Sequence, residues 1–202
     1  MKSFYDEAFE YTQEFEGQYP RPWMTDITDP TQADCLIVGF NQRNGYKVED
    51  VGDHSRHVDA LFNRNGQSCR GLYDRLNPNP SRTRINIDRL SKRLKNCGAK
   101  VLETNVICFS TPMSSDLTIR QRRAGLDVFK WLYGRILPRV LIVHGRGAAN
   151  ELAKLDTSES TVIEMAALAP PAYNKWHAES ESELDRIASL ACKILQSPAN
   201  QA

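Results

Sequence analysis

The chain has 202 residues, 41% of them hydrophobic, and a formal net charge of +1 at pH 7. This composition supports one substantial core, and no Ser-, Gly- or Pro-rich linker divides the chain. We therefore expect a single α/β domain over 1–196 and a frayed tail over 197–202. No apolar run reaches membrane-spanning length and the N-terminus is acidic and aromatic, so we expect a cytoplasmic protein without a signal peptide or a membrane partner.

The first helix is expected over 5–15 and the first strand over 34–42. In that strand the apolar run from Leu36 to Val38 stops at Gly39, and a polar loop follows. A long loop is expected over 46–76, and a helix over 81–96, where apolar residues recur at helical spacing before Gly98. The remaining expected elements are strand 100–107, helix 118–137, strand 139–147, helix 147–155, strand 161–165 and helix 181–195.

Strands that alternate with helices imply right-handed crossovers and a parallel sheet covered on both faces. The predicted fold class is therefore α/β, a three-layer α/β/α arrangement with a central, mainly parallel four-stranded sheet. In such sheets ligands bind beyond the carboxyl ends of the strands. We expect the functional residues to begin at Asn41 and to include Asn105 and His144, which lie towards the carboxyl ends of the expected strands 100–107 and 139–147.

Charge is distributed unevenly, with acidic residues near both ends and a basic middle. A patch of this kind suits the neutralisation of phosphates, although an Arg-rich helix with a solvated face is an equally ordinary interpretation. The basic residues concerned are Arg75, Arg82, Arg84, Arg89, Lys92, Arg93, Lys95, Arg120, Arg122 and Arg123.

Short motifs at the strand ends resemble those of the uracil-DNA glycosylase superfamily. Gly39-Phe40-Asn41 matches the first family motif, Gly-x-Asn-Pro or Gly-x-Asp-Pro, in the branch that includes mismatch-specific and single-strand-selective enzymes. Thr104-Asn105 matches the base-reading position. A strand that ends in His-Gly-Arg-Gly and a proline-containing segment near the end complete the order. The resemblance covers roughly 34–195 and implies a DNA partner, single-stranded or damaged, and a DNA repair hydrolase without a cofactor.

Two positions depart from the family pattern. Gln42 stands where the family has proline, and Ala169, followed by Pro170, stands where the family has the histidine of its final motif. In the family, that histidine stabilises the negative charge that develops on the uracil carbonyl, so its loss removes a large electrostatic contribution. His144 or His177 substitutes for it only if the fold brings either side chain to the same place.

The residue types suit hydrolysis of an N-glycosidic bond, which passes through an oxocarbenium-like sugar and an anionic base. We predict Asn41 as the catalytic residue that holds the water, because a neutral amide is not a strong base. Asn105 offers a donor and an acceptor to a base edge, and Phe62, or Tyr73, offers a stacking face. Helix capping by asparagine and core packing of Phe62 are the ordinary alternatives. The predicted base-binding set is Gly39, Phe40, Phe62, Asn105 and His144; the predicted DNA-binding set is Arg82, Arg84, Arg120, Arg122 and Arg123.

Cysteine and histidine spacing favours no metal site. The five cysteines form no C-x-x-C pair and are expected to act as small hydrophobes, except Cys69, which lies in a polar loop and is a candidate reactive thiol. His54 and His57 have the spacing of a metal pair, but no third ligand stands at a recognisable distance, so we expect no metal. The cysteines are Cys35, Cys69, Cys97, Cys108 and Cys192.

Three functions fit these patterns. The first is a DNA glycosylase that acts on uracil or a related base. The second is a catalytically weak or inactive relative that binds nucleic acid or a partner protein, which the missing histidine favours. The third is an enzyme that processes small nucleotides or nucleosides at the same strand ends, since a fold by itself does not define a function.

Overall fold

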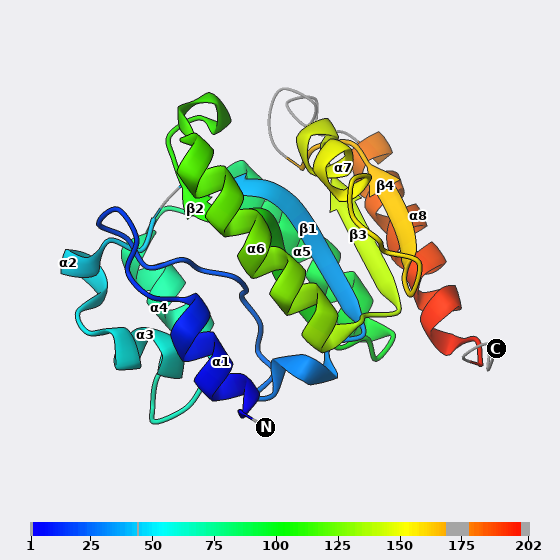
Figure 1. The fold of residues 1–202 in the computed structure, drawn as a ribbon. Coiled ribbons are helices and arrows are strands. Elements are labelled where there is room, and N and C mark those ends of the chain that lie inside the picture. Colours follow the sequence, from blue (N-terminus) through cyan, green and yellow to red (C-terminus); the bar gives the residue numbers. More distant parts are fainter. Residues whose placement is uncertain (1, 44, 169–177, 199–202) are drawn as a thin grey trace.

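A four-stranded sheet lies between two layers of helices in the computed structural model, which describes residues 2–43, 45–168 and 178–198 (Figure 1). Its strands are all parallel and lie in the order β2-β1-β3-β4. This arrangement confirms the predicted α/β fold class. The strands are β1 (Cys35–Gln42), β2 (Val101–Ser110), β3 (Val140–His144) and β4 (Thr161–Met165).

Helices connect the strands and also precede the sheet. No described helix has both the length and the apolar character needed to cross a bilayer. The described α-helices are α1 (Phe4–Tyr11), α2 (Val48–Val51), α3 (His54–Leu61), α4 (Cys69–Leu76), α5 (Arg82–Asn96), α6 (Ile119–Ile136), α7 (Arg146–Leu152) and α8 (Ala178–Gln196), with short 3-10 turns η1 (Pro30–Gln32) and η2 (Ser114–Asp116).

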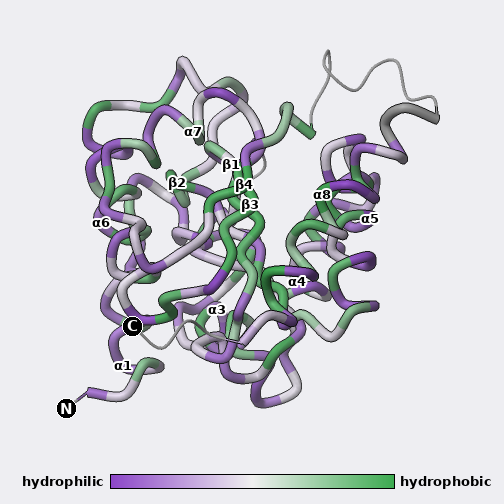
Figure 2. The backbone as a smooth tube through the Cα atoms, turned by 90° about the vertical axis from the view of Figure 1, so that its right-hand side faces the viewer, coloured by the Kyte–Doolittle hydropathy of each residue, from purple (hydrophilic) through white to green (hydrophobic). Residues whose placement is uncertain are grey.

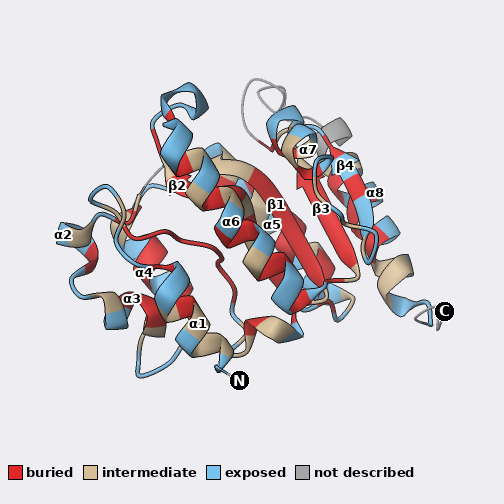
Figure 3. Ribbon diagram, viewed as in Figure 1, coloured by how far each residue is buried: buried red, intermediate tan, exposed pale blue. Residues whose placement is uncertain are grey.

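The two faces of the sheet bury separate apolar clusters, because successive side chains of a strand point to opposite faces. Leu36 and Val38 of β1 pack on the side of α6, with Phe129 and Leu132. Cys35 and Ile37 pack on the opposite side. There they meet Leu90 and Leu94 of α5, and Leu184 and Ile187 of α8. Figure 2 shows these three layers edge on, and Figure 3 shows β1 and β3 buried between them.

Helices α5 and α6 begin and end within one residue of the predicted bounds, whereas α7 ends three residues earlier than expected and α8 begins three residues earlier. The hydroxyl of Ser81 accepts a hydrogen bond of 3.1 Å from the backbone N–H of Arg84 and caps α5. Thr118 and Gln121 form a reciprocal capping box at the start of α6. That helix ends at Leu137, which has a left-handed backbone conformation just before Pro138.

The prediction of a long loop over 46–76 is wrong, because this segment folds into α2, α3 and α4. Each helix is only four to eight residues long, so its apolar stripe is too short to stand out in the sequence. The three helices are stabilised by packing against the N-terminal segment. The indole of Trp23 in that segment donates a hydrogen bond of 2.8 Å to the carbonyl of Leu61 at the end of α3. The N-terminal segment in turn lies along the edge of β2, where Met24 pairs with Glu103.

Cys35 and Cys108 are buried free thiols, as expected, but the expectation that Cys97 and Cys192 are free small hydrophobes is wrong. Cys97 and Cys192 form a disulfide, with Cα atoms 6.1 Å apart. Cys97 follows the last turn of α5 and Cys192 lies on α8, so the bond links two helices that pack side by side. Their separation of 95 residues carries no local signal of pairing.

Candidate active site

A cavity of about 1040 Å³ lies at the carboxyl ends of β1, β2 and β3, next to the N-terminal ends of α5 and α7. Four of the predicted catalytic and base-binding residues line it, namely Phe40, Asn41, Asn105 and His144. The described residues that line it are Arg21, residues 40–43, Tyr73, residues 81–84, Ile87, Asn105, Ser114, Ser115, Arg122, residues 144–147, Asn150, Glu151 and Ala167.

Asn105, Gly39 and His144 form a row across three adjacent strands. Gly39 pairs with Asn105 in the register of β1 and β2, and Val38 pairs with Val143 in that of β1 and β3. A Cβ atom on residue 39 would lie 2.5 Å from Oδ1 of Asn105 and 2.9 Å from Nε2 of His144. The absence of a side chain at Gly39 therefore lets the amide and the imidazole converge above it.

Neither converging side chain has a hydrogen-bond partner among the described residues, so both groups can interact with a ligand in the cavity. Burial lowers the pKa of His144 to about 4. The imidazole is therefore neutral at pH 7, with one N–H donor and one acceptor nitrogen. Asn105 lies within β2, which continues to Ser110 rather than ending at 107 as expected, because β2 keeps pairing with β1 up to Gln42.

The orientation of the Asn41 amide follows from two hydrogen bonds. The hydroxyl of Thr111 donates to the carbonyl of Met113 at 2.7 Å, so its oxygen accepts from Nδ2 of Asn41, at 3.0 Å. The same Nδ2 group lies 3.3 Å from the carbonyl oxygen of Gln42. With Nδ2 committed in this way, the amide oxygen of Asn41 is left as an acceptor at the cavity.

Gln42, which replaces the proline of the resembled motif, is buried and holds two neighbouring segments. Its side-chain N–H group donates to the carbonyl of Arg21, at 3.1 Å, and to the carbonyl of Cys108. A proline could make neither contact, because it lacks the amide side chain. The departure at this position therefore ties the 19–25 segment to the ends of β1 and β2.

Phe40 and Tyr73, rather than Phe62, are the aromatic residues that line the cavity. The guanidinium of Arg122 lies 5.5 Å from the centroid of the Phe40 ring. Phe62 is only 2% exposed and packs against Phe4, Tyr5 and Trp23. The prediction that Phe62 stacks on a base is corrected, since this side chain belongs to the core and does not line the cavity.

Six arginines but only one acidic residue, Glu151, occur among the described residues that line the cavity. Of the predicted DNA-binding set, Arg82, Arg84 and Arg122 are present. Arg120 does not line the cavity and pairs with Glu16 at 3.7 Å, and the exposed Arg123 does not line it either. The lining arginines are Arg21, Arg43, Arg82, Arg84, Arg122 and Arg146.

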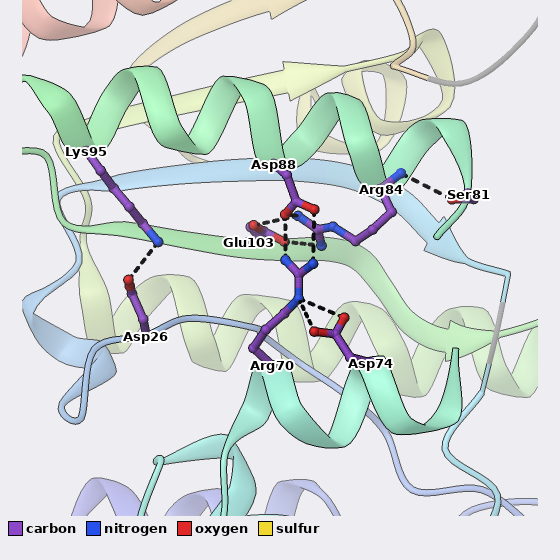
Figure 4. Close-up of polar contacts among 8 residues, drawn as sticks. All are labelled: Asp26, Arg70, Asp74, Ser81, Arg84, Asp88, Lys95 and Glu103. Atoms are coloured by element: carbon purple, nitrogen blue, oxygen red, sulfur yellow. Dashed lines mark hydrogen bonds and ion pairs between the residues drawn. The ribbon is translucent and has the colours of Figure 1, made fainter. Parts of the chain in front are cut away.

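Arg84 differs from the other lining arginines because carboxylates compensate its charge (Figure 4). Its guanidinium contacts Glu103 of β2 at 2.5 Å and Asp88 of α5 at 2.7 Å. Asp88 also binds Arg70 of α4, at 2.6 Å. This network joins α4, α5 and β2, so Arg84 acts mainly in positioning the start of α5.

Arg21 and Tyr73 reach the cavity from the N-terminal segment and α4. Arg21 was not among the predicted residues, because its only local signal is a position between two prolines, flanked by Tyr19 and Trp23. Arg43 directly follows β1 and Arg146 lies two residues after β3, so their strand-end positions are a sequence signal that could have identified them.

The final-motif positions Ala169 and Pro170, together with His177, lie outside the described residues. The segment that leads to them reaches the cavity, because Ala167 lines it and Asn86 of α5 donates a hydrogen bond of 3.0 Å to the carbonyl of Leu168. His144 is therefore the histidine that the described structure brings beside Asn105.

The remaining candidate residues lie outside the cavity. Cys69 is 1% exposed and burial raises the pKa of its thiol to about 11, which corrects the idea of a reactive cysteine in a polar loop. His57 is fully buried, and its Nε2 lies 2.9 Å from the carbonyl oxygen of Pro20. The described residues contain no group of three or more side chains suited to hold a metal ion.

Comparison with known protein families and with curated proteins finds no match for this chain. Its class is therefore defined by fold and site together. It is a three-layer α/β protein with an arginine-lined cavity at the carboxyl ends of three parallel strands.

Proposed function

We propose that this protein hydrolyses the N-glycosidic bond of uracil or a related base in DNA. The observation that carries the proposal is the convergence of Asn105 and His144 above Gly39, in the same cavity that contains Asn41 and Phe40. These residues supply the polar groups and the aromatic face that an extruded base requires. The motif resemblance to the uracil-DNA glycosylase superfamily, which several of the same residues carry, is a second support.

In the proposed reaction, water attacks C1′ of the sugar while the bond from C1′ to the base nitrogen breaks and leaves its electron pair on the base. The amide oxygen of Asn41 accepts a hydrogen bond from the water and orients it, since Thr111 holds the amide nitrogen away. The proton that the water releases passes to solvent, and the departing base is protonated from solvent. Asn41 therefore contributes by positioning rather than by taking a proton.

The base is recognised by groups on the opposite side of the cleaved bond. The Asn105 amide matches the adjacent carbonyl and N–H of a uracil edge, because it offers both an acceptor and a donor. Neutral His144 donates a hydrogen bond to the carbonyl oxygen on which negative charge develops, the task of the missing final-motif histidine. Phe40 supplies the stacking face.

The arginines suit a nucleic acid better than an uncharged substrate. Arg43, Arg82 and Arg146 are exposed at the cavity, where they can neutralise backbone phosphates. Asp88 and Glu103 compensate the charge of Arg84, but the described lining still holds more arginines than acidic residues. This excess favours DNA as the substrate over free nucleosides.

The test is incubation with oligonucleotides that contain uracil, hypoxanthine or a mismatch, followed by alkaline cleavage at abasic sites. We expect cleavage at the uracil-containing strand, and its loss in Asn41→Ala. A fully folded protein that cleaves none of these strands contradicts the proposal. The exposed Arg123→Gln serves as the control, because its side chain does not line the cavity.

A second candidate is a nucleic-acid-binding relative that does not cleave. The observation that favours it concerns the general base. The described lining of the cavity contains one carboxylate, that of Glu151, and this group pairs with Lys154 at 2.9 Å. Salt-dependent binding of oligonucleotides without any excision would select this candidate.

A further inference from the structure

Arg21 is a buried cation that the described structure leaves without a counter-ion. The residue is 7% exposed, and no described carboxylate forms an ion pair with it. Its Nε group is buried and has no hydrogen-bond partner among the described residues, as is also true of Nε of Arg84. Arg84, which is equally buried at the same cavity, contacts two carboxylates. A buried charge without a partner is costly, so the contrast between the two arginines points to a ligand.

The surroundings of Arg21 fix where its side chain lies. Its guanidinium carbon is 5.5 Å from the ring centroid of Tyr46 and 5.4 Å from that of Tyr73. Its backbone is held by a hydrogen bond of 3.2 Å from its N–H to the carbonyl of Cys108, and by the one that its own carbonyl accepts from Gln42. Two aromatic rings and two backbone hydrogen bonds thus hold a cation at the cavity wall, where Arg21 is part of the lining.

We infer that Arg21 binds a phosphate group that enters this cavity. A guanidinium presents a planar pair of N–H donors that matches two phosphate oxygens, and the tyrosine rings cannot supply the negative charge that it lacks. Gln42, the residue after Asn41, donates a hydrogen bond to the carbonyl of Arg21. The phosphate therefore lies on the same side of the cavity as Asn41. Identifying it as a DNA backbone phosphodiester beside the cleaved nucleotide rests on the proposed function.

The test measures the thermal midpoint of the full chain with inorganic phosphate, with the dinucleotide TpT and with thymidine, all at matched ionic strength. We expect phosphate and TpT to raise the wild-type midpoint by a few degrees, TpT at lower concentration, and thymidine to have no Arg21-dependent effect. Protection by phosphate alone overturns the phosphodiester assignment. Arg21→Met should lose the protection without lowering the midpoint of the ligand-free protein, because it removes an uncompensated buried charge.

The matched control is Arg186→Met, since Arg186 pairs with Glu183 on the surface, and this variant should keep the wild-type response. Equal protection of wild type and Arg21→Met, or no protection of wild type, overturns the inference. If Arg21→Met does not fold, phosphate binding by Arg21→Lys tests the inference instead. It keeps the charge but loses the planar pair of donors, so roughly tenfold weaker phosphate binding supports the inference and unchanged binding overturns it.

Excision assays on the same variants separate this inference from the proposed function. Arg21-dependent phosphate binding without excision of any base by the wild type upholds the phosphate site and contradicts the glycosylase. Excision that is unchanged in Arg21→Met, together with unchanged phosphate protection, upholds the glycosylase and contradicts the phosphate site.

Discussion

Thr111 fixes the amide of Asn41, because its hydroxyl oxygen accepts a hydrogen bond of 3.0 Å from Nδ2 while its proton is donated to the carbonyl of Met113. A residue of β1 is thereby oriented by a residue that follows β2. The direction of one amide oxygen thus depends on contacts between segments 70 residues apart.

The role of this contact is tested by Thr111→Val, which preserves shape but removes the hydroxyl. We expect the Asn41 amide to lose its fixed orientation and excision to fall by roughly 10- to 100-fold, with a loss of stability of about 1 kcal/mol. Asn41→Ala should abolish excision. Single-turnover rates and urea denaturation measure the two effects. Excision by Thr111→Val at the wild-type rate would show that this hydrogen bond does not position the amide.

Gly39→Ala tests the convergence above Gly39. The new Cβ would overlap the ends of the Asn105 and His144 side chains, which can move, rather than the backbone. We therefore expect the fold to persist and base binding to fall by about 1–3 kcal/mol. The control is Gly134→Ala, where no atom lies within 4 Å, and which should stabilise α6 by about 0.5–1 kcal/mol. Unchanged binding of a uracil-containing oligonucleotide by Gly39→Ala would contradict this geometry.

The stability of the protein should fall as the pH is lowered from about 6.5 towards 4. Burial lowers the pKa values of His144 and of His57 to about 4 in the folded state, so the unfolded state binds more protons across this window. Each histidine contributes on the order of 3 kcal/mol that is present above pH 6.5 and lost below about pH 4. Urea denaturation at a series of pH values should show that His144→Gln loses about half as much stability as the wild type over this range, because only His57 remains. A pH dependence identical to that of the wild type would contradict the burial of a neutral His144.

Salt dependence tests which arginines contact DNA. Arg146 lines the cavity and Arg123 does not, although both side chains are exposed. We expect Arg146→Gln to reduce the log–log slope of affinity against salt by about 0.7–0.9, and Arg123→Gln to leave it unchanged. Fluorescence anisotropy with a labelled oligonucleotide measures both slopes. Equal slopes for the two variants would mean that the DNA backbone does not contact the arginines of the cavity in preference to others on the surface.

Reduction of the disulfide between Cys97 and Cys192 should destabilise the protein by roughly 2–5 kcal/mol, since the bond closes a long loop of the unfolded chain. Urea denaturation with and without a reductant measures the difference. The double variant Cys97→Ser, Cys192→Ser is the control and should not respond to the reductant. If the wild type does not respond either, the bond contributes nothing to stability.

Patterns within a few residues were enough to predict the sheet and its main helices. The apolar run before Gly39 predicts a buried strand, and the residues around Ser81 and Thr118 predict two helix starts that the structure confirms. Parallel strands then require that Asn41 and His144 lie at one edge of the sheet, because the carboxyl ends of such strands point the same way.

Only the tertiary structure decided what surrounds those strand ends. It places Phe62 in the core, pairs Arg84 with Glu103, and leaves the equally buried Arg21 without a carboxylate. It also joins Cys97 to Cys192 across 95 residues. The sequence determines which groups each strand and helix carries, whereas burial and charge compensation depend on neighbours far along the chain. Those neighbours are fixed only when the layers pack, and so is the chemical role of each side chain.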